Sequence, residues 1–89
     1  MRSSNIAQAA ATGDVTTQSG YLRSVVLTAA AATSTVVVRA GGSGGTVVLT
    51  LSAVANTSAP SGDLGDALCK DGIHVTLTGA AAVATVVYV

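Results

Sequence analysis

The alternation of apolar and polar residues predicts β-strands over much of the chain. The clearest alternation is in residues 73–78, where isoleucine, valine and leucine alternate with a histidine and two threonines. Residues 46–52 alternate in the same way, and we expect Val47, Leu49 and Leu51 on the inward face. Strict alternation of this kind is typical of an antiparallel strand with one buried face.

Three further runs are rich in β-branched residues and are bounded by small residues, which favours strands. They cover residues 20–28, 34–40 and 83–89. Residues 63–69 predict either a short irregular strand or one turn of helix, whereas residues 55–62 predict a loop with the only proline. The whole pattern predicts an all-β fold, a small antiparallel β-sandwich or jelly-roll-like barrel of five to six strands.

Residues 41–45 contain four glycines and separate two of these strands. Glycine accepts positive φ at almost any turn position, so this segment predicts a β-hairpin. A phosphate-binding loop is the alternative, but such a loop precedes a helix and carries a lysine. Because a strand follows here and the lysine is missing, we favour the hairpin.

Residues 1–18 are small and polar and have no clear period. Gly13 and Asp14 interrupt any helix that the preceding alanines begin. We therefore expect an N-terminal arm, extended or disordered, followed by a single β domain over residues 19–89. Disorder is the commoner property of such a terminus. Attachment to a neighbouring subunit is the functional alternative.

The composition excludes several classes of protein. Only 9% of the residues are charged and the net charge is zero, so the chain lacks the basic surface of a nucleic-acid-binding protein. No apolar run approaches the roughly 18 residues of a membrane helix. The first residues do not resemble a secretory signal, and one cysteine cannot form a disulfide framework. We expect neither nucleic acid nor membrane as a partner.

The apolar residues also predict self-association. They make up 49% of the 89 residues, but alanine and valine dominate and there is no phenylalanine or tryptophan. A single small domain built from such side chains buries little apolar area per residue. Zero net charge removes the repulsion between copies. We expect a homo-oligomer in which part of the core is shared between chains.

Cys69 and His74 are the single residues of their types. His74 falls on the polar face of its strand, where we expect an exposed surface histidine, because a metal site needs further ligands. Cys69 is expected to act as a small hydrophobic residue at a loop edge. A Cys69–His74 nucleophilic pair lacks a third group. We expect no catalytic, metal-binding or cofactor-binding residues, no cofactor, and a protein that is not an enzyme.

Asp63, Asp66 and Asp71 form the only acidic cluster. Three carboxylates within nine residues could supply the oxygen ligands that Ca²⁺ prefers, but their spacing does not match a calcium-binding loop. Aspartate in a turn commonly accepts a hydrogen bond from a nearby backbone N–H group, and we favour this role.

Four residues are candidates for an interface. Arg23 and Arg39 lie within predicted strands, where they either pair with aspartates, stay solvated or reach across an interface, since arginine is enriched there. Tyr21 and Tyr88 are the only aromatic residues. They are candidates for interface anchors, and core positions suit them equally well.

Two stretches resemble a group of small tailed-phage virion proteins. The first runs from Gly20-Tyr21-Leu22-Arg23 through the glycine-rich hairpin to Leu49, and the second is the Asp71-Gly72-Ile73 turn with the strand that follows it. The similarity covers about residues 20–89. It implies a β-sandwich or jelly-roll-like virion component. Proteins of this group commonly act as trimeric capsid decoration (cement) proteins or as head or tail fibre parts.

The resemblance leads to a functional expectation. We expect a virion structural protein, made in the host cytoplasm, that forms a trimer on the capsid surface and clamps neighbouring subunits of the major capsid protein. A head or tail fibre, or a receptor-binding module for a host-surface ligand, is the alternative. A self-assembling fibre is a weaker alternative. Residues 1–18 are expected to anchor the protein to the shell and to be dispensable for the folding of residues 20–89.

Overall fold

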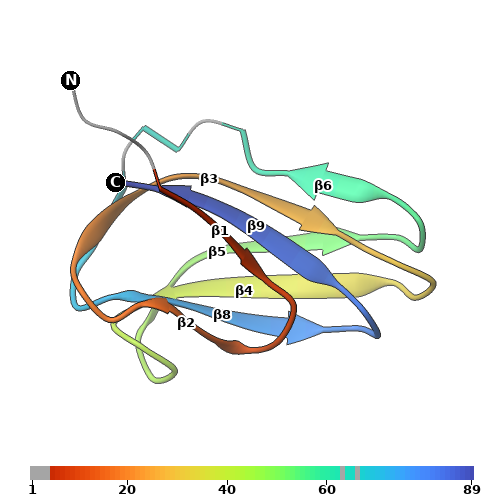
Figure 1. Ribbon diagram of the computed structural model, residues 1–89, viewed down its shortest axis with the longest axis horizontal. Coiled ribbons are helices and arrows are strands. Elements are labelled where there is room, and N and C mark those ends of the chain that lie inside the picture. The colour runs from red at the N-terminus through yellow and green to blue at the C-terminus, as the bar shows by residue number, and fades with distance from the viewer. Residues whose placement is uncertain (1–4, 63, 66) are drawn as a thin grey trace.

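The computed structural model describes residues 5–62, 64–65 and 67–89, and these residues form nine β-strands and no helix. The strands build two antiparallel sheets that run along the long axis of the molecule (Figure 1). The predicted all-β sandwich is confirmed. The number of strands exceeds the expected five to six because four short strands lie in segments that the pattern did not assign firmly.

Each sheet has a simple spatial order. Sheet A contains β1 (Asn5–Ala9), β9 (Val83–Tyr88), β3 (Gly20–Thr28) and β6 (Ser58–Pro60), with β7 (Ala67–Cys69) paired to the other end of β3. Sheet B contains β2 (Gly13–Thr16), β8 (Ile73–Thr78), β4 (Ser34–Ala40) and β5 (Thr46–Ala53). Among these strands only the β4–β5 and β6–β7 connections stay within one sheet. Most neighbours in a sheet are therefore distant in the sequence.

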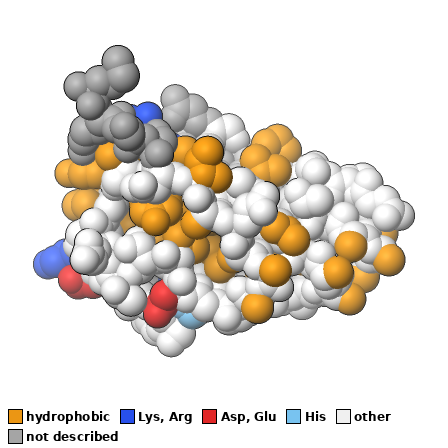
Figure 2. Space-filling model, viewed as in Figure 1, with side chains coloured by type: hydrophobic (Ala, Val, Ile, Leu, Met, Phe, Trp, Pro, Cys, Tyr) orange, Lys and Arg blue, Asp and Glu red, His pale blue; other side chains and the backbone are white. Residues whose placement is uncertain are grey.

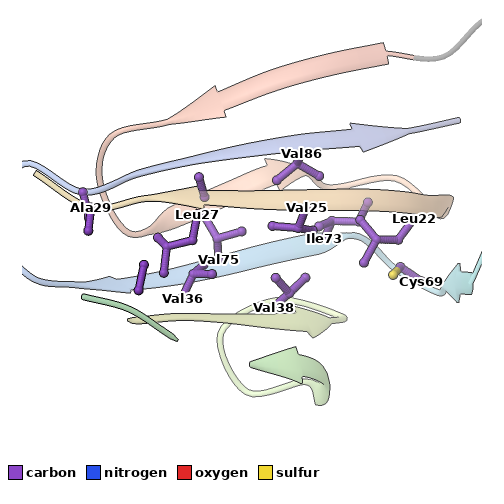
Figure 3. Close-up of a cluster of buried hydrophobic side chains, with 13 residues drawn as sticks. Leu22, Val25, Leu27, Ala29, Val36, Val38, Cys69, Ile73, Val75 and Val86 are labelled. Atoms are coloured by element: carbon purple, nitrogen blue, oxygen red, sulfur yellow. The ribbon is translucent and has the colours of Figure 1, made fainter. Parts of the chain in front are cut away.

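The core lies between the two sheets and consists of inward-facing aliphatic side chains (Figure 3). Strands β3 and β9 contribute from sheet A, and strands β4 and β8 contribute from sheet B. The fully buried members are Leu22, Val25, Leu27, Val36, Val38, Cys69 on β7, Ile73, Val75, Ala84 and Val86. Full burial of each valine, leucine or isoleucine side chain contributes roughly 1.5–3 kcal/mol to folding. Alternation of inward and outward residues along each strand produces this core.

The separate N-terminal arm expected over residues 1–18 is not confirmed. β1 pairs with β9, from Asn5 opposite Tyr88 to Ala9 opposite Ala84, and β2 pairs with β8. The described part of this segment thus belongs to both sheets. It shows no period in the sequence because each strand is short. The inward residues of β1 are alanines, which contrast little with the small polar residues beside them, and β2 contributes only Val15 to the core.

Residues 58–62, 64–65 and 67–69 lie along the open edge of β3, where they form two short strands. β6 and β7 pair with the two ends of β3. Between them, the Ser61 N–H donates to the Val25 carbonyl at 2.8 Å, and the Leu64 N–H donates to the Arg23 carbonyl at 2.8 Å. A proline is tolerated in β6 because an edge strand can leave one N–H position unused. The loop predicted for residues 55–62 therefore includes a short strand. Asp63 and Asp66 lie outside the described residues.

A β-bulge changes the expected face of one residue in β5. Val38 is opposite Leu49, but the next residue of β4 is opposite Val47, so Val48 is an extra residue in the ladder. Leu49 and Leu51 pack against the core as expected, and Val48 joins them. Val47 is 50% exposed, so its predicted inward position is wrong. A single inserted residue reverses the alternation beyond it.

The predicted glycine-rich hairpin joins β4 to β5. Gly41 and Gly42 have φ values of 96° and 93°, which favour glycine. The Gly45 N–H donates to the Gly42 carbonyl at 3.0 Å, and a Cβ atom at Gly45 would collide with the carbonyl of Ala40. Only glycine fits this closing position, and a strand follows directly.

Candidate functional site: the two outer faces

The outer face of sheet A carries apolar side chains in each of its rows, interspersed with polar residues such as Gln8, Ser24 and Thr85. Cross-strand neighbours in an antiparallel pair project to the same side of the sheet. Ile6 is opposite Val87, and in the next row Val26 is opposite Pro60 on one side and Thr85 on the other. We call this surface the apolar face. Its apolar members are Ile6, Tyr21, Val26, Pro60, Leu68, Val83 and Val87.

Several members of the apolar face remain accessible. Ile6 is 71% exposed, Leu68 is 60% exposed, and Leu68 is the cross-strand neighbour of the exposed Tyr21. The backbone of Val89 exchanges two hydrogen bonds with Tyr21, at 2.9 and 2.8 Å, which extends this row by one more apolar residue. Figure 2 shows hydrophobic side chains reaching the surface over much of the view, with few charged groups among them.

The outer face of sheet B carries hydroxyl groups instead. Thr35 is opposite Thr78 on β8 and Ser52 on β5, and the Thr35 and Ser52 hydroxyls are 3.4 Å apart. In the next row Thr76 and Thr50 flank a single valine. We call this surface the hydroxyl face.

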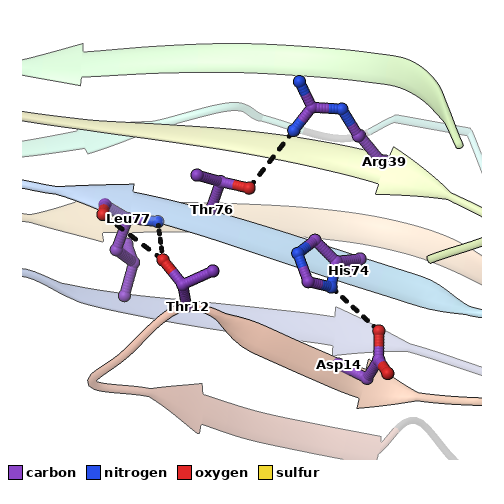
Figure 4. Close-up of polar contacts among 6 residues, drawn as sticks. All are labelled: Thr12, Asp14, Arg39, His74, Thr76 and Leu77. Carbon is purple, nitrogen blue, oxygen red and sulfur yellow. Dashed lines mark hydrogen bonds and ion pairs between the residues drawn. The ribbon is translucent and has the colours of Figure 1, made fainter. Parts of the chain in front are cut away.

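A charged row crosses one end of the hydroxyl face. Asp14 on β2, His74 on β8 and Arg39 on β4 are consecutive cross-strand neighbours. The Nδ1–H group of His74 donates to Oδ1 of Asp14 at 2.8 Å (Figure 4). Nδ1 carries a proton in this bond, because the carboxylate oxygen can only accept. Arg39 donates from Nη1 to the Thr76 hydroxyl at 3.2 Å.

The expectation that His74 is exposed is wrong. It lies on the polar side of its strand as predicted, but the residue is only 7% exposed. Its strand lies between β2 and β4, and the Asp14 side chain, which is 48% exposed, accepts the hydrogen bond of the ring. The sequence could not identify this pair, because Asp14 and His74 are 60 positions apart and only the β2–β8 register brings them together.

Thr12 attaches the start of β2 to the hydroxyl face. Its hydroxyl accepts a hydrogen bond from the Leu77 N–H at 3.0 Å and also lies 3.4 Å from the Leu77 carbonyl (Figure 4). This side chain replaces a backbone partner at the end of the β2–β8 ladder. It holds β2 in the position that places Asp14 beside His74.

Cys69 and His74 are not brought together. Cys69 is fully buried on the inward side of sheet A, whereas His74 projects from the outer side of sheet B. Burial raises the pKa of the Cys69 thiol above its usual value, which keeps it protonated and unreactive. The geometry therefore gives no support to a nucleophilic pair. The prediction that Cys69 packs as a small hydrophobic residue is confirmed.

The four interface candidates occupy different environments. Tyr21 lies on the apolar face, whereas Tyr88 packs against the edge of the core. Arg23 lies in a bulge of β3, where the register shifts between Leu22 and Ser24. Arg39 is half-buried and bound to Thr76 within its own chain. Tyr21 is thus the candidate that the fold presents most directly to a partner.

Asp71 lies in the turn between β7 and β8. It has a φ of 66°, and its N–H donates to the Ser19 hydroxyl at 2.9 Å. Within residues 5–62, 64–65 and 67–89, no three side chains of the metal-binding types gather into a site. The same residues contain no helix of a length and hydropathy that would cross a membrane. A hollow of about 410 Å³ at the β1–β2 corner is lined by residues 7–11 and 13–15, of which only Asp14 is charged.

No family model matches the chain, and neither does any curated protein or solved structure.

Proposed function

We propose that this chain is a non-enzymatic structural protein of a virion, a capsid decoration protein that binds the protein shell through its apolar face. The observation that carries this proposal is the difference between the two outer faces. Apolar side chains, of which Ile6, Tyr21 and Leu68 are exposed, predominate on the outer face of sheet A, whereas hydroxyl groups predominate on the outer face of sheet B. Contiguous exposed apolar surface is typical of protein–protein contact sites.

The proposed partner is the major capsid protein. Ile6, Tyr21 and Leu68 are the exposed large hydrophobic residues of this face and are suited to anchor the contact, since the buried centre of an interface favours aromatic and aliphatic groups. The valines between them have few rotamers, so little side-chain entropy is lost when they are covered. A glycan on a host surface is a poorer match, because stacking on a sugar requires aromatic rings and Tyr21 alone supplies one here.

The test compares two valines in equivalent positions. Val87 lies on the apolar face and Val37 lies on the hydroxyl face, and both are half-buried on interior strands. Val87→Lys places a charge in the proposed contact, and Val37→Lys places the same charge outside it. The purified variants are mixed with shells of the major capsid protein encoded in the same genome, and co-sedimentation is measured.

We expect wild type and Val37→Lys to bind the shell alike and Val87→Lys to bind at least about ten-fold more weakly. Ile6→Lys is a second variant, because a side chain that is 71% exposed tolerates substitution without unfolding. Thermal melting verifies that each variant is folded. Equal binding by the Val87, Ile6 and Val37 variants, or no binding by wild type, would refute the proposal.

A further inference from the structure

Four segments form the open edges of the two sheets, and they differ in how well they are protected. β1 has five residues, β2 has four and contains a bulge, and the segment 58–69 is broken into two three-residue strands. β5 has eight residues, with neither a charge nor a proline. Short length, bulges, charges and proline are the usual devices that prevent an edge from pairing with another chain. β5 is the least protected edge, with one bulge at Val48.

The core is also incomplete beside β5. Leu49 and Leu51 point inward and pack against buried residues, yet both remain partly exposed. No further strand of sheet B continues beyond them in the described chain. Val47 and Val54 add exposed apolar surface at the two ends of this edge. A strand added to β5 would cover the leucines and bind backbone groups of the edge.

We propose that β5 pairs antiparallel with β5 of a second copy of this chain, which joins the two B sheets into one sheet of eight strands. Across a two-fold axis the same strand of each copy meets its counterpart, so the strand must be complementary to itself. β5 meets that need because it carries no charge that would repel its copy, and the net charge of the chain is zero. The inference rests on the proposed function in one respect: a protein that decorates a shell is present in many copies, which can pair with one another.

The bulge limits the register of this pairing. The regular part of β5 runs from Leu49 to Ala53, with the leucines inward and Thr50 and Ser52 outward. If inward residues are to lie opposite inward residues over all of residues 49–53, Leu51 lies opposite Leu51 of the other copy. Thr50 then lies opposite Ser52 of the other copy. A slip by one residue would oppose leucines to hydroxyls.

The first experiment measures mass in solution by light scattering over a dilution series. Thr50→Lys puts a charge on the edge strand, and Thr78→Lys puts the same charge at an exposed position of the same face on an interior strand. Neither position belongs to the apolar face. We expect wild type and Thr78→Lys to have a mass near twice 8.5 kDa. Thr50→Lys should dissociate at least about ten-fold more readily.

The second experiment tests the register by disulfide formation. Thr50→Cys and Ser52→Cys variants are oxidised separately and as a mixture, and Cys69 does not interfere because it is buried. Opposed residues of paired strands are close enough for a disulfide. We expect cross-linked dimers mainly in the mixture. A Thr78→Cys and Thr35→Cys mixture is the matched control, because these neighbours on one sheet lie away from the edge.

Three results would overturn the pairing: a monomer at all concentrations, a stable mass of three chains, or equal effects of Thr50→Lys and Thr78→Lys. Equal cross-linking by the edge and control mixtures would do the same. Failure of the proposed function is distinguishable. A dimer that ignores the shell contradicts the decoration role and leaves the pairing intact, and a shell-binding protein that stays monomeric does the reverse.

Discussion

The outer faces of sheets A and B carry different types of side chain, although the inner faces of both sheets carry aliphatic side chains. On sheet A, Ile6 is opposite Val87, and Val26 lies in the next row, opposite Thr85. On sheet B, the equivalent positions hold threonines and the row that contains His74. The inner faces satisfy the requirement for a core, which both sheets share. The outer faces do not contribute to that core, so their difference reflects what each surface meets outside the molecule.

The two faces also differ in how they contribute to stability. The hydroxyl face contains the Asp14–His74 bond and the Arg39–Thr76 bond, which tie β2, β8 and β4 together. The apolar face offers side chains that gain free energy only when a partner covers them. Substitutions on the hydroxyl face should therefore change folding, and substitutions on the apolar face should change binding.

Removing residues 1–16 should have the largest effect on stability, because it takes one edge strand from each sheet. β9 would lose its partner β1, and β8 would lose β2 together with Asp14. We expect loss of the cooperative thermal transition measured by circular dichroism. A truncated chain that melts like the full chain would show that the segment is an arm after all.

His74→Ala should cause the next largest loss of stability. Compared with a substitution on the apolar face, it shows whether the hydroxyl face contributes more to folding. It leaves a cavity in a nearly closed site and an unpaired carboxylate, at a cost of about 2 kcal/mol in the free energy of unfolding. Thr85→Ala, at an interior position on the apolar face, should cost less than about 0.5 kcal/mol.

A double-mutant cycle isolates the contact of His74 with Asp14. Adding Asp14→Ala should reveal a coupling of about 0.5–1 kcal/mol, since the carboxylate is half exposed and solvent screens it. Urea denaturation provides the free energies of unfolding. Equal losses for His74→Ala and Thr85→Ala would contradict the stabilising role assigned to the hydroxyl face.

Val26→Thr and Val37→Thr provide a milder comparison, because they change polarity while keeping shape. Both valines are half-buried on interior strands, so each substitution should cost less than about 1 kcal/mol of stability. Val26→Thr should weaken shell binding about three- to ten-fold, and Val37→Thr should leave it unchanged. The reverse order of binding would assign the contact to the hydroxyl face.

Substitution of Cys69 should have the smallest effect, a change in how stability depends on pH. It tests the core between the sheets and neither outer face. Burial raises the pKa of its thiol above the usual 9.0, so the folded state holds the proton more tightly than the unfolded state. The stability from this preference is complete below pH 9.0 and is lost as the pH rises from there through the raised value. Cys69→Ala should lose less stability over this range in urea titrations. Identical pH profiles for the two proteins would contradict this prediction.

Much of the fold could be predicted because its longer strands have one buried face. The hairpin between β4 and β5 and the alternation in β8 are local features, and the structure confirms them. β1, β2 and β6 were missed because each has five residues or fewer and they pair with strands far away in the sequence. The Val48 bulge was missed because it depends on the register against β4.

By itself, the sequence determined the class of fold, the inward residues of β8 and the glycine-dependent turn. These properties follow from the period of two along a strand and from the backbone freedom of glycine. Only the tertiary structure decided that Asp14 meets His74, that the apolar outward residues gather on sheet A, and that β5 is left as an open edge. Each of these depends on which strands lie side by side. Local alternation carries no information about that choice, because every strand offers the same backbone hydrogen bonds to any neighbour.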